Sequence, residues 1–241
     1  TPLCPHDGGS VVPAEDPRCG LRVGSYQIMG RLGRGGMGAV YRGEHVIIGK
    51  QVAIKVLHKS LAGQRQILER FLIEARAASM IRHPNIVDVT DFGGLPDGSP
   101  FFVMEFLEGP NLEQEITRRK QLPLYRAVNI LNQVGRALHA CHRKDVVHRD
   151  LKPENIVLLP REGQRDLVHL PGDSGIHPKV RKEKGWDFVK ILDFGVARIQ
   201  QMTASLDRET EKQGIVFGSP YYVSPEQARG EAGDYRSDLY S

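Results

Sequence analysis

The first half of the chain contains short runs of alternating apolar and polar residues, interrupted by glycines. Between Tyr26 and about Leu57 these runs are YQIMGRL, GAVYRGEHV and QVAIKVL, and all are rich in β-branched or aromatic residues. The alternation predicts an antiparallel meander of strands. A further run, FFVMEFL at 101–107, is almost wholly apolar and predicts a buried strand, which Gly109 and Pro110 terminate.

Two segments instead have the three- and four-residue spacing of amphipathic helices. In residues 64–82 the spacing places Ile67, Phe71, Ala75 and Ala78 on one helical face. Residues 123–142 carry a longer stripe, and Pro123 suits the first turn of this second helix. The stripe consists of Ala127, Ile130, Leu131, Val134, Ala137, Leu138 and Cys141.

Strands therefore fill the first part of the chain and helices the second, which predicts an α+β protein with two lobes that meet at residues 105–110. Residues 1–24 are rich in Pro, Gly and small polar residues and show neither period, so we expect a linker or the remnant of a preceding module that contributes little to the core. The chain lacks an initiator Met and stops directly after SDLYS, and we expect it to be a fragment.

Composition narrows the class of protein. Hydrophobic residues make up 40% of the 241 residues and charged residues 26%, which excludes fibrous and wholly disordered chains. The net charge is only +4 and the basic residues form no long block, so a nucleic-acid partner is not indicated. Three widely spaced cysteines make no disulfide framework, and no apolar run approaches the ~18 residues of a membrane span, so we expect a cytoplasmic protein.

A glycine-rich segment is the first candidate for binding chemistry. LGRGGMGAVY at 32–41 has Gly33, Gly35 and Gly38 in the spacing G-x-G-x-x-G-x-V, which lets backbone N–H groups approach phosphates. Alone, the motif fits a glycine-rich hairpin equally well. A strand follows it where a dinucleotide-binding fold would have a helix, so the dinucleotide interpretation is disfavoured.

Lys55 in VAIK lies on the strand that follows, where an ammonium group can hold phosphates if a carboxylate fixes its position. Glu74, on the helix at 64–82, is the candidate carboxylate; taken alone it is better interpreted as a solvated helix residue, and the motifs that follow favour the phosphate-site role.

Two later motifs carry groups suited to phosphoryl transfer. In VVHRDLKPENIVLL at 146–159, Asp150 can accept a proton, Lys152 can stabilise a phosphate, and Asn155 can bind a metal ion. In ILDFGVAR, Asp193 is a hard carboxylate suited to Mg²⁺, and Gly195 lets the backbone turn. A last motif, GSPYYVSPE, occupies 218–226.

Taken together and in this order, these motifs resemble those of a protein kinase, and HPNIV at 83–87 and VMEF at 103–106 also match the family. Lys152 and GSPYYVSPE resemble the Ser/Thr branch, and GRGGMGAVY is similar to eukaryotic-like bacterial Ser/Thr kinases. The resemblance covers about Tyr26 to Ser241. It implies a two-lobed kinase fold, with an antiparallel β small lobe at 26–107 and a mainly helical large lobe at 108–241, incomplete at the C-terminus.

The resemblance also implies roles for single residues. Asp150 would orient the substrate hydroxyl and accept its proton, Lys152 would neutralise the γ-phosphoryl group, and Lys55 paired with Glu74 would hold the α- and β-phosphates of ATP. Asn155 and Asp193 would hold Mg²⁺. The other expected ATP contacts are the phosphate loop Leu32, Gly33, Arg34, Gly35, Gly36, Met37, Gly38, Ala39 and Val40, the adenine-sandwiching Ala53 and Val157, the gatekeeper Met104, and the backbone of Glu105 and Leu107.

Regulation and partners follow from the same resemblance. Arg149 would pair with a phosphorylated residue of the activation segment, for which Thr203, Ser205 and Thr210 are the candidates. Ser219 stands where the family usually has Thr. His148 and Phe194 would be core residues. The partners would be protein substrates with Ser or Thr acceptors, and a homodimer is compatible with the resemblance.

The chain departs from the family pattern in three places. About two dozen residues are inserted around 160–187, as a disordered loop or a docking element. Cys4, His6 and Cys19 could be half of a zinc ribbon but contain no CxxC pair, so we predict no metal there. Asp238 holds the position that anchors the catalytic loop, whereas Glu226 would pair with an arginine that this chain does not contain.

The sequence leaves two rival functions open. A pseudokinase would bind nucleotide without transfer, but every catalytic position is filled. A small-molecule phosphotransferase of related fold could share the Asp and Asn spacing, although it would not be expected to carry Lys152 with GSPYYVSPE.

Overall fold

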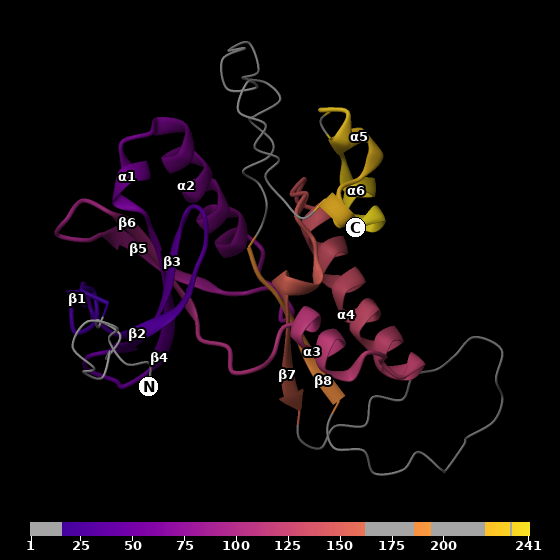
Figure 1. Cartoon of the computed structure of the whole chain (residues 1–241), viewed down its shortest axis with the longest axis horizontal. Coiled ribbons are helices and arrows are strands. Elements are labelled where there is room, and N and C mark those ends of the chain that lie inside the picture. Colours follow the sequence, from indigo (N-terminus) through magenta and orange to yellow (C-terminus); the bar gives the residue numbers. More distant parts are fainter. Residues whose placement is uncertain (1–15, 162–185, 194–219, 232) are drawn as a thin grey trace, which may run out of the picture. The chain divides into compact units, whose positions relative to one another are not determined.

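The computed structural model describes residues 16–161, 186–193, 220–231 and 233–241, which group into two compact units (Figure 1). The first unit comprises the described residues up to Arg65 together with Thr90–Phe106, and the second comprises Gln66–Val89 and the described residues from Leu107 onward. This is the two-lobed α+β arrangement that the sequence predicts. Within the described ranges, no helix combines the length and apolar character needed to cross a membrane.

A six-stranded sheet forms the first unit, in the order β1-β2-β3-β4-β6-β5. The predicted meander corresponds to β2, β3 and β4, and the apolar run at 101–107 corresponds to β6. Each of the pairings β1–β2, β2–β3, β3–β4 and β4–β6 is antiparallel. The strands are β1 (Arg22–Val23), β2 (Tyr26–Arg34), β3 (Gly38–His45), β4 (Gln51–Leu57), β5 (Val89–Gly94) and β6 (Pro100–Glu105), with the short helix α1 (Lys59–Ala62) after β4.

One face of this sheet carries the core of the first unit. Its alternating apolar residues pack into a single cluster, as the alternation in sequence predicts. Burial of these side chains contributes about 25 cal/mol per Å² of apolar area removed from water. The cluster contains Val23, Ile28, Ala39, Tyr41, Val52, Ile54, Val56, Leu95, Phe101 and Val103.

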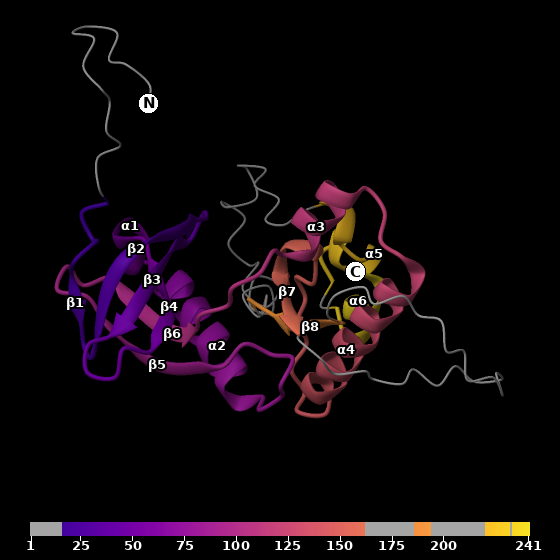
Figure 2. The same ribbon diagram turned by 90° about the horizontal axis from the view of Figure 1, so that it is seen from below.

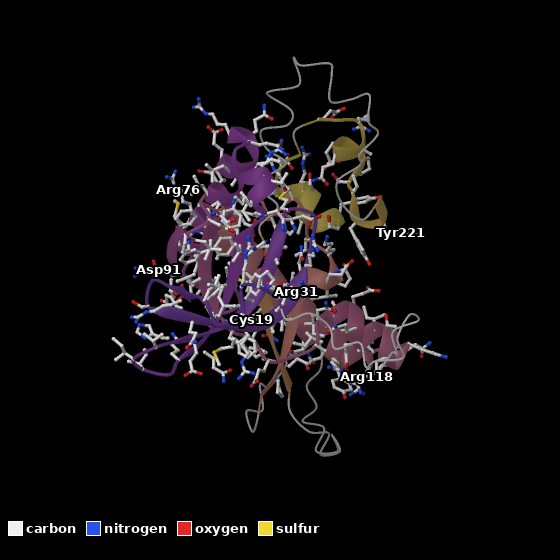
Figure 3. The ribbon with its side chains drawn as sticks, turned by 60° about the vertical axis from the view of Figure 1, so that its left-hand side comes forward. Cys19, Arg31, Arg76, Asp91, Arg118 and Tyr221 are labelled. Atoms are coloured by element: carbon white, nitrogen blue, oxygen red, sulfur yellow. The ribbon has the colours of Figure 1, made fainter. Side chains whose placement is uncertain are left out.

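Residues 16–24 contribute more to this unit than expected. β1 adds to the edge of the sheet, and Val23 is only 2% exposed within the core. Asp16 accepts hydrogen bonds from the Tyr41 hydroxyl at 3.2 Å and from Arg31, which is labelled in Figure 3, at 3.0 Å. The polar composition of this stretch conceals its role, because its contacts are made with strands much later in the chain.

Helices dominate the second unit (Figure 2). The two predicted helices correspond to α2 (Arg65–Met80) and α4 (Leu124–His142), with Pro123 as the residue preceding the first turn of α4. Five of the seven stripe residues of α4 are buried, but Leu131 is 67% exposed. Leu131 follows Ile130, so it lies about 100° further around the helix and off the buried face.

A two-stranded antiparallel hairpin of β7 (Ile156–Arg161) and β8 (Trp186–Ile191) completes the second unit, and α4 packs beside β8 (Figure 1). Asn85 and Gln133 fix this packing, because both hydrogen-bond the backbone of Val189. Among the described residues, the remaining helices are α3 (Leu112–Arg119), α5 (Pro225–Ala228) and α6 (Tyr235–Tyr240), and 3₁₀ turns lie at Pro153–Asn155 and Pro220–Tyr222.

The helix α3, which sequence periodicity does not predict, contains a buried carboxylate. Glu115 is only 1% exposed and forms ion pairs with Arg118, Arg119 and Arg126. Figure 3 labels Arg118 on this helix. Burial alone would raise the pKa of Glu115, but hydrogen bonds from the three arginines outweigh it and lower the pKa to about 2. Arg126 also pairs with Asp187 of β8 at 2.6 Å, so this network joins α3, α4 and β8.

We expect the Glu115 network to make stability depend on pH. Because the pKa of Glu115 is about 2 in the folded protein and near 4.5 when unfolded, its stabilisation is complete above pH 4.5 and is lost as the pH falls toward 2. Urea titration should show that the stability advantage of the parent over Glu115→Gln shrinks by about 2 kcal/mol between pH 6 and pH 3. Glu113→Gln, in the first turn of α3, is the control for removing one carboxylate from this helix. If the free energies of unfolding of the parent and Glu115→Gln differ by the same amount at pH 6 and at pH 3, the proposed effect of the network is wrong.

Candidate active site

The predicted site residues divide between the two units. The glycine-rich segment, Ala53, Lys55, Met104 and Glu105 belong to the first unit, whereas Glu74, Leu107 and all predicted residues from Asp150 onward belong to the second. Lys55 and Glu74 thus belong to different units, and their predicted pairing stays a prediction.

The glycine-rich segment forms the β2–β3 hairpin. Its turn closes through a hydrogen bond from Gly35 N to Gly38 O at 2.8 Å, and His58 donates from its backbone N to Met37 O at 2.9 Å. A Cβ on Gly38 would lie 2.2 Å from the carbonyl oxygen of Val56, so only glycine lets β3 run this close to β4. Gly33 and Gly36 face open space, which leaves the hairpin backbone accessible.

Lys55 lies on β4 directly opposite this hairpin. Its Cα pairs with Val40 of β3 on one side and with Phe102 of β6 on the other, and its Nζ lies 5.8 Å from the centre of the Phe102 ring. Lys55 is half-buried. The sheet register therefore carries an ammonium group next to the strand that leaves the glycine turn.

The residues predicted to contact adenine in the first unit also lie in this register. Ala53 pairs with Met104 across β4 and β6, and both are buried. Glu105 follows at the end of β6, while Leu32 on β2 is 49% exposed. Ala39 differs from its neighbours because its side chain belongs to the core cluster at 3% exposure, so only its backbone is available to a ligand.

In the second unit, the segment 148–155 brings the predicted catalytic groups together. The Nζ of Lys152 lies 3.3 Å from the Oδ2 of Asp150. The amide Nδ2 of Asn155 donates to the backbone oxygen of Asp150 at 2.8 Å and approaches its Oδ2 at 3.4 Å. A carboxylate, an ammonium group and an amide thus lie within one loop, and the carboxylate remains partly exposed.

Asp238 of α6 anchors this loop. The buried carboxylate accepts from His148 N at 2.9 Å through Oδ2 and from Arg149 N at 2.7 Å through Oδ1. These bonds hold Arg149 at φ +64°, a conformation that costs a non-glycine residue on the order of 1 kcal/mol. The structure therefore agrees with the expectation that Asp238 anchors the loop 148–155.

His148 connects the same loop to the end of β8. Its side chain is fully buried, and burial lowers the pKa of the imidazole, so the ring is neutral. Its Nε2 bonds the carbonyl oxygen of Leu192 at 3.0 Å, and Leu192 N donates to Asn155 O at 2.8 Å. Because Asp193 follows Leu192, these bonds position the predicted metal ligand, which has φ +46°. The expectation that His148 is a core residue agrees with its burial.

The HPNIV segment holds β8 from its other side. Asn85 accepts from Ile191 N at 2.8 Å and donates through Nδ2 to Val189 O at 2.7 Å, while Val87 N donates to Ile191 O. Ile86 thus forms a parallel bridge with Ile191 of β8. Because Asp193 follows Ile191 by two residues, these bonds help to position it.

The oxygen atoms of Asn155 and Asp193 fit a magnesium ion better than a softer metal. Mg²⁺ usually takes one or two such side chains and completes its shell with water and substrate phosphates. Because Nδ2 of Asn155 is used within the loop, its Oδ1 is the atom that could coordinate. Across the described part of the chain there is no group of three or more His, Cys, Asp or Glu residues arranged to hold a metal ion.

Several predicted residues lie outside the described residues. They are the regulatory candidates Thr203, Ser205 and Thr210, together with Ser219, Phe194, Gly195, Cys4 and His6. Most of the insertion at 160–187 lies there too. Arg149, the expected partner of the three regulatory candidates, does lie among the described residues. Burial lowers the pKa of its guanidinium group.

Three supporting residues were missed by sequence reasoning. His142 bonds Asp238 Oδ2 at 2.8 Å, Gln133 ties α4 to β8, and Gln227 Nε2 donates to the carbonyl oxygen of Arg149 at 3.0 Å. None of the three lies within a motif that carries chemistry, although Gln227 directly follows SPE. Glu226 accepts from the Ser237 hydroxyl at 2.6 Å, a partner within the chain that we did not expect.

Comparison with known proteins identifies the fold and the family. The model of the protein kinase domain matches residues 26–241. The chain is 42% identical to the serine/threonine-protein kinase Pkn1 of Myxococcus xanthus over 231 residues, and 36% identical to PrkC of Bacillus subtilis over 223 residues. A crystal structure of a double mutant of the Mycobacterium tuberculosis PknI kinase domain has a TM-score of 0.64 at 24% identity, and the match covers 92% of this chain and 71% of that one.

The matches cover most of this chain but only part of its relatives. Pkn1 and PrkC are matched over 96% and 92% of this chain, which corresponds to 29% and 30% of their own lengths. The catalytic-loop and glycine-rich motifs lie inside the matched range. The chain therefore belongs to the protein kinase family, as a Ser/Thr kinase domain of the eukaryotic-like bacterial type.

Proposed function

We propose that the protein containing this chain transfers the γ-phosphoryl group of ATP to Ser and Thr hydroxyls of protein substrates. The observation that supports this most is the loop 148–155, in which Asp150, Lys152 and Asn155 converge on one another. A binding-only module has no need for a partly exposed carboxylate held between a cation and an amide.

Each residue then has a separate task. Asp150 orients the acceptor hydroxyl and takes its proton, and Lys152 stabilises negative charge on the transferred group. Lys55, with Glu74, holds the α- and β-phosphates, which the backbone of Gly33 to Val40 covers. Asn155 and Asp193 provide oxygen ligands for Mg²⁺, which when bound neutralises phosphate charge.

The remaining ATP contacts complete the proposal. Ala53 and Val157 enclose the adenine ring, the backbone of Glu105 and Leu107 bonds its edge, and Met104 limits the depth of its pocket. Ala53 and Val157 are both buried, as a desolvated adenine site requires. The domain limits 26–107 and 108–241 for the two lobes remain part of this proposal.

We also propose control by phosphorylation of Thr203, Ser205 or Thr210. Burial disfavours the charge of Arg149, and a phosphate group beside it would compensate by charge-assisted hydrogen bonds. Autophosphorylation between two copies, and a cytoplasmic location, are further parts of the proposal; the latter rests on the odd number of widely spaced cysteines.

The test is to incubate the protein containing this chain with Mg²⁺, ATP and three kinds of acceptor: Ser/Thr peptides, Tyr peptides and small hydroxyl metabolites. Mass spectrometry then shows which acceptors, and which residues of the protein itself, carry phosphate. We expect phosphate on Ser and Thr of the peptides and on the activation segment, and none with Lys55→Met. The matched control Lys50→Met changes an exposed lysine in the β3–β4 turn and should keep full activity. ATP binding without transfer would indicate a pseudokinase, and phosphate on metabolites alone would indicate a small-molecule phosphotransferase.

A further inference from the structure

A surface groove lies on the second unit, and none of its lining residues is among those assigned to phosphoryl transfer. It has a volume of about 560 Å³ and is lined by one face of α4, by Arg143 directly after α4 and by His83. The α4 residues in its wall lie at helical spacings of three and four, so they form one continuous strip. The lining residues are His83, Asn132, Gly135, Arg136, His139, Ala140 and Arg143.

This groove has a basic wall. Two guanidinium groups and two imidazoles line it, and no lining residue is acidic. Arg136 and Arg143 are exposed, and within the described ranges neither forms an ion pair. A neighbouring hollow shares His83 and adds Arg82 and Lys190, with Asp88 as its acidic residue.

His83 supplies a neutral donor to the groove. Its Nδ1 accepts a hydrogen bond from Asn85 N at 3.2 Å, so the proton of the neutral ring resides on Nε2. Burial lowers the pKa of His83, and the charges of Arg136 and Lys190 lower it further. The same charges that disfavour a proton on His83 favour an anion beside it.

From this geometry we propose that the groove docks an acidic stretch of a partner protein. Arginine forks bind carboxylates with paired hydrogen bonds, and Arg136 and Arg143 lie seven residues apart, about 10 Å along the helix. The strip from Asn132 to Arg143 spans about 16 Å, the length of roughly five extended residues. Ala140, between Arg136 and Arg143, and Gly135, beside Arg136, have short side chains or none, which leaves room for a peptide backbone.

The proposed docking is independent of phosphoryl transfer, because its residues and those of the catalytic loop do not overlap. Its test is binding of a fluorescein-labelled, capped eight-residue peptide that contains four glutamates, measured by fluorescence anisotropy at 50 and 150 mM salt. A peptide with glutamine at these four positions is the matched ligand. The protein variants are Arg136→Glu, Arg143→Glu and their double mutant, with Arg136→Gln as a milder change. The control is Arg76→Glu, an exposed arginine on α2 (Figure 3) that lines neither hollow.

We expect the glutamate peptide to bind the parent and Arg76→Glu equally, and to bind the double mutant about tenfold more weakly. Affinity should fall as salt is raised, because exposed charges are screened. Phosphorylation of a short peptide without acidic residues should be unchanged in all variants, provided that their thermal unfolding matches the parent. Equal binding of the glutamine peptide, or unchanged binding by the double mutant, would overturn the proposal. If millimolar inorganic phosphate alone displaces the glutamate peptide, the groove binds a small anion and the proposal is overturned. It is likewise overturned, in favour of a nucleic acid, if a single-stranded RNA binds the parent more tightly than the peptide does and this binding is lost in the same variants.

Discussion

Asp150→Asn should lower kcat for peptide phosphorylation by about 10³-fold, within the 10²–10⁴ range of a lost general base. The amide keeps the shape of the carboxylate but cannot take the proton of the acceptor hydroxyl. The loop itself should survive, because the shorter hydrogen bond of Asn155, at 2.8 Å, is to the backbone oxygen of Asp150 and not to its side chain. The KM for ATP and the melting temperature should therefore stay close to those of the parent.

Asp145→Asn is the matched control for this change. Asp145 is exposed in the turn after α4, and its φ of +56° is one that asparagine adopts readily. Steady-state kinetics of both variants, with ATP and peptide varied separately, decide the outcome. If Asp150→Asn keeps more than a tenth of the parental kcat, another group takes the proton and the assigned role of Asp150 is wrong.

The proximity of Asp150, Lys152 and Asn155 could be predicted from the sequence because the three residues are close together along the chain; their catalytic roles stay predictions. All three lie within six residues, and the hydrogen bonds that join them are made inside the same loop. The helices α2 and α4 could be predicted because their buried faces repeat along a single segment. Local spacing is sufficient information in both cases.

Glu115 and Gln133 show where this information ends. Glu115 appears as an ordinary charged helix residue, yet it is buried because Arg126, which also pairs with Asp187, supplies the compensating charge. Gln133 interrupts the apolar pattern of α4 but bonds the backbone of Val189, 56 residues later. Arg126 lies on the next helix and Val189 on a distant strand, and the periodicity of a single segment contains neither contact.

For residues 16–24, the prediction of a linker was wrong for the same reason, since contacts with distant segments make this stretch part of the first unit. Their Pro-, Gly- and polar-rich composition predicts a linker, but Arg18 bonds Ser99 at 3.2 Å and Asp16 bonds Tyr41. Each of these bonds joins residues that are more than twenty positions apart. The ATP contacts split between the two units remain predictions, because they require groups from both.

Asp238→Asn should be the most destabilising of the changes considered. The carboxylate accepts from two backbone N–H groups through different oxygens and from His142 Nε2 at 2.8 Å, and it is 2% exposed. An asparagine has only one oxygen, so its NH₂ group would face a buried N–H donor. A buried donor left unsatisfied costs about 1–3 kcal/mol, and the strained Arg149 would lose part of its restraint.

We expect a loss of about 3 kcal/mol in the free energy of unfolding, which for a chain of this size lowers the melting temperature by about 6–12 °C. Asp234→Asn is the control, because Asp234 caps α6 by accepting from Arg236 N, a role that asparagine fills equally well. At a temperature where both variants are folded, kcat should fall at least tenfold in Asp238→Asn alone, since Asp150 directly follows the two residues that lose their anchor. If the two variants have the same melting temperature and the same kcat, the bonds of Asp238 are not needed to hold the loop. Other bonds, such as His148 to Leu192 and Gln227 to Arg149, are then sufficient.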